Sequence, residues 1–145
     1  MKTAMIAWPL AAALGAGAVA GAQETAPLQP GEYQVSIRLE LPHIEGKGLV
    51  TTMASICVPP GDAGTQGLFV LSDLNPLRSC PASNVRRNGD TLTFDIACPA
   101  SDAAVGSASY TIRAEHFDGT IAVKMGGKNM TMVERQSGRR VGNCK

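Results

Sequence analysis

The sequence is poor in aromatic residues, in histidine and in net charge. Aromatic residues make up 4% of the 145 residues, two histidines occur, and 13 basic against 12 acidic residues give a net charge of +1. Such a chain has no bulk field that would attract nucleic acid or an anionic membrane. Its hydrophobic content of 44% and its 16 glycines exclude an acidic disordered chain, and its length fits one domain.

Beyond residue 22 the sequence lacks an apolar run of membrane-spanning length, and its long apolar stretch lies at the N-terminus. Lys2 supplies a positive charge, residues 4–19 carry no charge, and Ala20-Gly21-Ala22 has the small-x-small pattern of a cleavage site. A transmembrane helix needs about 20 apolar residues, and this stretch is shorter and rich in alanine and glycine. We therefore predict a signal peptide over residues 1–22, cleaved after Ala22, and a soluble product in the oxidising periplasm.

After a flexible lead-in over residues 23–30, residues 31–145 read as a single β domain. Residues 31–41 alternate strictly between apolar and polar side chains, which is typical of a half-buried strand, and residues 49–58 form a second, β-branched segment. Residues 59–82 contain four prolines and three glycines and are expected to be an irregular covering segment. A short helix over residues 66–74, anchored by Leu68, Phe69 and Leu71, is one form that this segment could take.

Three dipeptides suit two-residue type I′ turns, namely Asn88-Gly89, Asp118-Gly119 and Gly126-Gly127. These turns would place Val85 opposite Leu92, Ile112 opposite Met125, and Ile121 opposite Met132, because partners in a hairpin share a face. The resulting inward face comprises Leu92, Phe94, Ile96, Cys98, Tyr110, Ile112, Ala114, Ile121, Val123, Met125, Met130 and Met132. The outward face comprises Arg113, Glu115, Ala122 and Lys124. We predict an all-β fold, a strongly curved antiparallel meander or open barrel of about 7–8 strands, because a single apolar face must curl or be covered.

Four cysteines in an exported chain predict a disulfide framework with three possible pairings. No Cys-x-x-Cys occurs and the spacings fit no zinc motif, so a metal site built from thiolates is disfavoured. We favour Cys57–Cys80, which would pin the covering segment, and Cys98–Cys144, which would tie down the C-terminus. The other two pairings stay open.

Several landmarks together resemble domain-of-unknown-function family 3617, which comprises small exported proteins of Gram-negative bacteria. The landmarks are Pro30-Gly31-Glu32-Tyr33, Cys57-Val58-Pro59-Pro60, Cys80, Asn88-Gly89-Asp90-Thr91, Cys98, Lys124-Met125, Met130-Thr131-Met132, and the closing run from Gly138 to Cys144. The resemblance covers nearly all of residues 30–144. It implies a periplasmic location and a small β domain, and it implies no reaction and no catalytic residue.

Candidate chemistry is scarce. His43 lies in an expected loop. His116 is adjacent to Glu115 on an expected strand, so the side chains of Glu115 and His116 point to opposite faces and cannot chelate together. No nucleophile motif occurs, and we predict neither catalysis nor a cofactor. Met125, Met130 and Met132 could present thioethers to Cu(I), although their predicted inward position favours a packing role.

We therefore predict a non-enzymatic periplasmic binding or structural module that holds a small apolar ligand or a segment of a protein partner. The alternatives are a copper-handling protein that uses Met125, Met130 and Met132, and a cryptic enzyme without a recognisable site.

Overall fold

The computed structural model describes residues 28–41, 49–61, 68, 72–100, 104–126 and 130–145. These residues form one open sheet of seven antiparallel strands and contain no helix. The strands are β1 (Gly31–Glu40), β2 (Leu49–Val58), β3 (Ala82–Asn88), β4 (Thr91–Ala97), β5 (Val105–Ile112), β6 (His116–Lys124) and β7 (Thr131–Gly142). The predicted all-β class is confirmed, and the first two strands match the expected segments.

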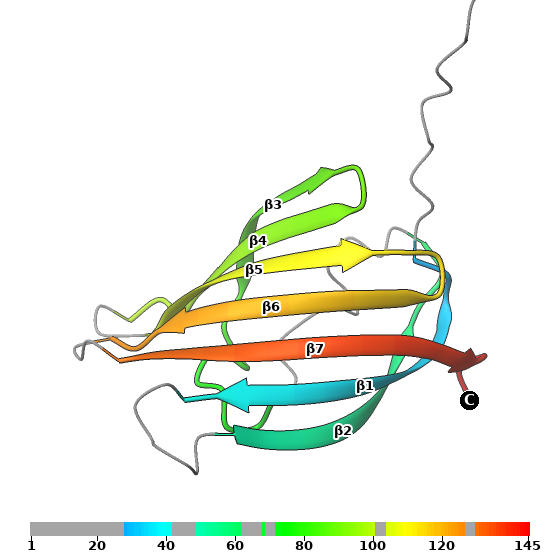
Figure 1. Ribbon diagram of the computed structural model, residues 1–145. Helices are drawn as coiled ribbons and strands as arrows, with labels where there is room; N and C mark the ends of the chain where they lie inside the picture. Colours follow the sequence, from blue (N-terminus) through cyan, green and yellow to red (C-terminus); the bar gives the residue numbers. More distant parts are fainter. Residues whose placement is uncertain (1–27, 42–48, 62–67, 69–71, 101–103, 127–129) are drawn as a thin grey trace, which may run out of the picture.

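The strand order across the sheet is β2-β1-β7-β6-β5-β4-β3. Strands β3 to β7 therefore form a meander, and β7 returns to pair with β1. The connection between β2 and β3 has to cross from one edge of the sheet to the other. Its residues 72–81 pass behind the sheet in Figure 1 and cover one face of it, as the sequence predicted.

The core lies between this covering segment and the inner face of the sheet. Alternate residues of β1 are buried, as predicted, and the same alternation runs through β4, β5 and β6. From the covering segment, Leu68 and Leu77 are fully buried against this face. The largest buried apolar side chains are Tyr33, Leu39, Leu68, Leu77, Leu92, Phe94, Ile96, Tyr110, Ile112, Phe117 and Ile121.

The β3–β4 turn lies one residue further along the chain than predicted, which shifts the cross-strand register by two residues. Asn88 pairs with Thr91, so Gly89-Asp90 is the turn, and Leu92 lies opposite Arg87 instead of Val85. Gly89 has a φ of 60°, which suits glycine at the first position of a type II′ turn.

The predicted turn at Asp118-Gly119 was wrong, because both residues lie inside β6. Tyr110 of β5 is directly opposite Gly119, and a Cβ on Gly119 would lie 2.1 Å from the Tyr110 ring. The glycine therefore provides space for an aromatic ring rather than a turn. The chain instead reverses at Ala114-Glu115, where the Arg113 N–H donates to the His116 carbonyl at 2.9 Å.

The β6–β7 connection is longer than predicted. Met125 pairs with Met130 by a backbone hydrogen bond of 2.9 Å, and Ile121 lies opposite Glu134 rather than Met132. Met130 is 42% exposed, which contradicts its predicted place in the core, whereas Met132 is 4% exposed. Each of the three register errors is an even number of residues, so the rest of the predicted inward face is buried or half-buried in the structure.

The disulfide pairing that we favoured was also wrong. Cys57 bonds to Cys144 with a Cα–Cα distance of 5.5 Å, and Cys80 bonds to Cys98 with a Cα–Cα distance of 4.7 Å. The second pair continues the register of the β3–β4 ladder, in which Ala82 pairs with Ile96. Cys80 lies two residues before Ala82, and Cys98 lies two residues after Ile96. The first pair forms because β7 returns beside β1 and carries the C-terminus toward β2.

Among the described residues no helix has the length and apolarity required to cross a bilayer. The predicted signal peptide, most of the lead-in, the loop with His43 and the anchors Phe69 and Leu71 lie outside the described residues. Most of residues 66–74, where we considered a short helix, lie outside the described residues, and the described residues 72–80 consist mainly of turns.

Candidate functional site

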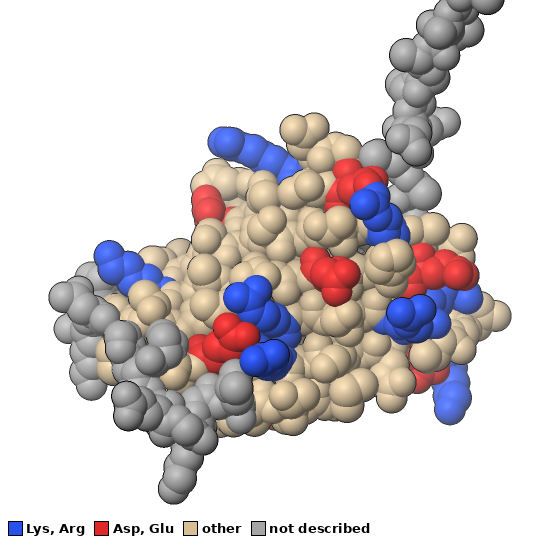
Figure 2. All heavy atoms as spheres, viewed as in Figure 1, with Lys and Arg blue, Asp and Glu red and all other residues tan. Residues whose placement is uncertain are grey.

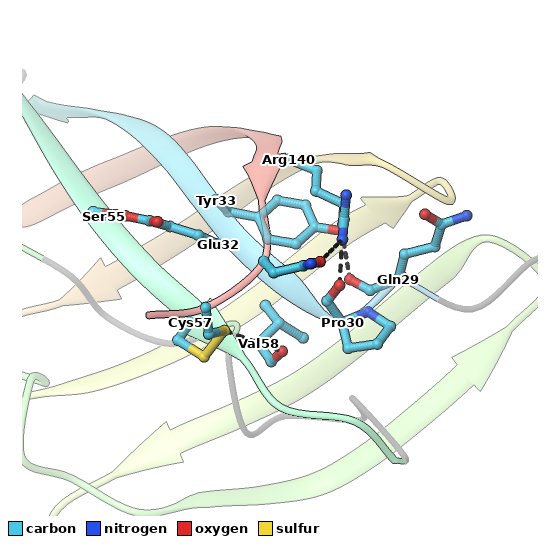
Figure 3. Close-up of a disulfide and its surroundings, with 10 residues drawn as sticks. Gln29, Pro30, Glu32, Tyr33, Ser55, Cys57, Val58 and Arg140 are labelled. Carbon is cyan, nitrogen blue, oxygen red and sulfur yellow. Dashed lines mark hydrogen bonds between the residues drawn. A yellow bond between two sulfur atoms is a disulfide. The ribbon is translucent and has the colours of Figure 1, made fainter.

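The start of β1 and the end of β7 are clamped together by Arg140. Its Nε donates to the Pro30 carbonyl at 3.0 Å, and its Nη2 donates to the Asn143 Oδ1 at 2.9 Å. Figure 3 shows the guanidinium lying over the Gln29–Pro30 turn of the chain, beside the ring of Tyr33. The Tyr33 hydroxyl donates to the Gln29 carbonyl at 2.7 Å, and burial raises the pKa of this phenol, an effect that the positive charge of Arg140 opposes.

Two landmarks of the sequence meet at this clamp, namely the run that begins at Pro30 and the closing run that ends at Cys144. Both have structural roles. Gly31 approaches the Gly142 carbonyl and the Arg140 side chain so closely that a Cβ would lie 2.4 Å from the carbonyl oxygen. Gly138 lies opposite Phe117, whose ring occupies the space of a Cβ at 2.3 Å. The clamp therefore fixes the closing strands.

A buried polar cluster joins the covering segment to the sheet. The carboxylate of Glu134, on β7, is fully buried and accepts hydrogen bonds from the Ser72 backbone N–H at 3.2 Å, the Asn75 Nδ2 at 2.7 Å and the Gln136 Nε2 at 2.8 Å. The Tyr110 hydroxyl donates to the Gln136 Oε1 at 3.0 Å. Burial, with a contribution from the charge of Glu134, raises the pKa of Tyr110 well above its ordinary value of 10.0.

We did not predict this cluster, although the sequence contains a signal for it. Met132 was placed on the inner face, and Glu134 and Gln136 follow it at intervals of two along the same strand. Residues two and four further along a strand share its face, so two long polar side chains had to lie in the core or distort the strand. The partners in the covering segment, Ser72 and Asn75, carried no comparable signal.

The outer face of the sheet carries hydroxyl groups and mixed charges. One cross-strand row comprises Thr51, Arg38, Arg135, Thr120, Ser109, Thr93 and Arg86. The carboxylate of Glu40 lies 3.4 Å from the Nε of Arg38 and 3.0 Å from the Nε of Arg135. Figure 2 shows positive and negative side chains interspersed on this face, so it selects neither an anionic nor a cationic partner.

The two edges of the sheet differ in how they are protected against pairing with another strand. At the β3 edge the register shifts between Ser83 and Arg86, and Asn84 has a φ of 52°. Arg86 and Arg87 add positive charges along this short strand. Bulges, charges and short length are the devices by which proteins block edge pairing.

The β2 edge has none of these devices. Its sequence LVTTMASICV contains no charged residue and no proline, and its ten pairs with β1 run without a register shift. In the described part of the chain β2 pairs with β1 alone. Met53 is 58% exposed on the outer face and Val50 is 36% exposed on the inner face.

The disulfide between Cys57 and Cys144 holds this edge in place. It links the end of β2 to the tail that follows β7, and so spans β1, which lies between the two strands. Figure 3 shows the disulfide beside Val58 at the end of β2. An edge strand fixed in this way is already ordered, so an added strand does not have to meet the entropic cost of ordering it.

Residues 28–144 match the family described as "protein of unknown function (DUF3617)". The chain belongs to this family. No curated protein and no solved structure matches the DUF3617 chain.

The DUF3617 domain places the residues singled out from its sequence in separate regions. His116 is exposed at the start of β6, opposite Arg139, and far along the strand from Met125. The described residues contain no group of three or more histidine, cysteine, aspartate or glutamate side chains that could hold a metal ion. All four cysteines are in disulfides. The β2 edge is therefore the feature that calls for a functional explanation, with the three methionines considered separately below.

Proposed function

We propose that this DUF3617 domain is an exported, non-enzymatic binding module that takes up an extended segment of another protein as an additional strand beside β2. The observation that carries the proposal is the contrast between a protected β3 edge and an unprotected β2 edge. In strand addition, main-chain hydrogen bonds supply affinity and alternate side chains supply specificity. Because β2 carries no charge, the preferred segment is uncharged and rich in β-branched residues.

Export to the periplasm is part of the same proposal. Two disulfides fix the ends of β2, β4 and the covering segment, and such bonds persist in oxidising compartments. The predicted signal peptide over residues 1–22 supports the same location.

The absence of catalysis is likewise proposed. A buried carboxylate such as that of Glu134 could in principle serve as a catalytic acid. Its oxygens, however, accept hydrogen bonds from Ser72, Asn75 and Gln136 of the same chain. It is 0% exposed, and the covering segment lies over it. Binding of a small apolar ligand on the inner face stays a prediction. Leu68 and Leu77 already occupy part of that face, which leaves less of it for a ligand.

The test is selection from a displayed library of random extended peptides, followed by hydrogen exchange of the purified, disulfide-bonded protein. We expect enriched peptides to be uncharged and β-branched and to protect the amides of β2. Met53→Lys places a charge on the outer side of this edge and should abolish binding. Val85→Lys, at a residue 46% exposed on the β3 edge, is the matched control and should bind normally.

Enrichment of no peptide, protection of another region, or equal binding by Met53→Lys would each overturn the proposal. The melting temperature of both lysine variants shows that the fold is retained, which we expect because both positions are exposed.

A further inference from the structure

Three methionines lie at the end of the β6–β7 hairpin. The Met125 N–H donates to the Met130 carbonyl at 2.9 Å, so these two residues are direct cross-strand partners. The next inward pair along the ladder is Val123 with Met132. Met125, Met130 and Met132 therefore share one face of the hairpin, with Met132 diagonal to Met125, and long side chains reach across such diagonals.

The exposure of the three side chains is graded from core to solvent. Met132 is 4% exposed, Met125 is half-buried against the core, and Met130 is 42% exposed. Filling of the core accounts for Met132. It does not account for Met130, a large part of which is open to solvent.

Thioethers are neutral, soft ligands that select Cu(I) and similar monovalent cations, and they bind without losing a proton. Both disulfides use up the four thiols of the chain, so cysteine does not compete for a soft metal here. In an oxidising compartment, where thiols are lost to disulfides, methionine is the soft ligand that remains. His116 lies at the opposite end of β6 from Met125 and cannot join the site.

We infer that Met125, Met130 and Met132 form a thioether site for a monovalent soft cation, with Cu(I) as the natural occupant. The partly exposed Met130 admits the ion, and the buried Met132 provides a fixed ligand. The site lies on β7 and at the end of β6, and β1 separates it from the β2 edge, so it is independent of strand addition.

The experiment uses Ag(I), which needs no reductant that would threaten the disulfides, with protein purified from the periplasm of an expressing host and labelled with ¹³C at the methionine methyl groups. We expect one Ag(I) per chain and shifts of the Met125, Met130 and Met132 methyl resonances. Met130→Leu should weaken binding by at least about tenfold, because loss of even an outer-shell partner of a ligand typically lowers metal affinity by about 10–100-fold. Because Met130 is partly exposed, this variant should keep the wild-type melting temperature.

Met53→Leu is the matched control, since Met53 is a more exposed methionine on a distant strand, and it should bind Ag(I) as the wild type does. Unchanged affinity of Met130→Leu would overturn the inference. An equal loss in Met53→Leu would do the same, because it would show unspecific binding to exposed thioethers.

Discussion

Replacing Glu134 by glutamine keeps the shape of the side chain but removes its charge and one of its acceptor atoms. The Oε1 of Glu134 accepts from the Ser72 N–H and the Gln136 Nε2, and its Oε2 accepts from the Asn75 Nδ2. A glutamine can keep its oxygen toward the first two donors, but its NH2 group then faces the NH2 group of Asn75. Asn75 cannot simply rotate its amide, because its Oδ1 accepts the Leu77 N–H at 3.0 Å.

The magnitude follows from these contacts. Hydrogen bonds to charged groups contribute about 1.5–3 kcal/mol and neutral ones about 0.5–1.5 kcal/mol, so two bonds that become neutral lose about 1 kcal/mol each. The third, with two opposed donors, costs about 1–3 kcal/mol. Relief of the desolvation of a buried charge offsets part of this sum. We expect Glu134→Gln to lower the free energy of unfolding by about 2–4 kcal/mol, a large part of the 5–15 kcal/mol of a typical domain.

The assay is guanidinium unfolding with the disulfides intact, in which the midpoint should fall while the m-value stays constant. Asn75→Ala and the double variant complete a thermodynamic cycle. Glu134→Gln should lower the free energy of unfolding by less when Asn75 is already alanine, because the opposing amide is then absent. The expected coupling energy is about 1–2 kcal/mol, within the range seen for residues in contact.

Glu32→Gln is the matched control. Glu32 is half-buried on the outer face, and its carboxylate accepts a hydrogen bond from the Ser55 hydroxyl at 2.7 Å. It should cost less than about 1 kcal/mol. The reasoning would be refuted if Glu134→Gln cost no more than Glu32→Gln, or if the cycle gave no coupling with Asn75.

Three further predictions follow from the packing, the tyrosines and the disulfides. Gly119→Ala should lower the free energy of unfolding by about 1–3 kcal/mol through overpacking against Tyr110, whereas Gly142→Ala, with nothing within 4 Å of the new Cβ, should change the melting temperature little. Because the folded-state pKa values of Tyr33 and Tyr110 are raised above 10.0, their contribution to stability is complete below pH 10 and is lost as the pH rises above it. Ultraviolet titration should therefore show tyrosinate in the native protein only above pH 10, and ionisation of both rings near their ordinary value would contradict the buried environment. Each disulfide can be removed separately by replacing both of its cysteines with serine. This should lower the free energy of unfolding by about 4.6 kcal/mol for the disulfide between β2 and the tail, and by about 3.2 kcal/mol for the one between the covering segment and β4. Chemical unfolding of the two double variants checks this order, and peptide mapping of the wild type checks the pairing.

The amino-acid pattern by itself determined which face of β1, β4, β5 and β6 is buried. Alternation is a property of a single strand, so Tyr33, Val35, Ile37 and Leu39 could be assigned to the core without knowing their neighbours. The assignment survived three misplaced turns, because shifts by an even number of residues leave every side chain on its own face. The same period could have identified Glu134 and Gln136 as buried polar groups.

Tertiary structure alone decided where the turns and the disulfides are. Asp118-Gly119 has the local preference of a turn, but the ring of Tyr110 takes up the space above Gly119, and that ring comes from another strand. The return of β7 to β1, which no local pattern encodes, brings Cys144 to Cys57. It also leaves β2 at an edge, so the region where we propose binding depends on the order of strands in space rather than on the sequence of β2.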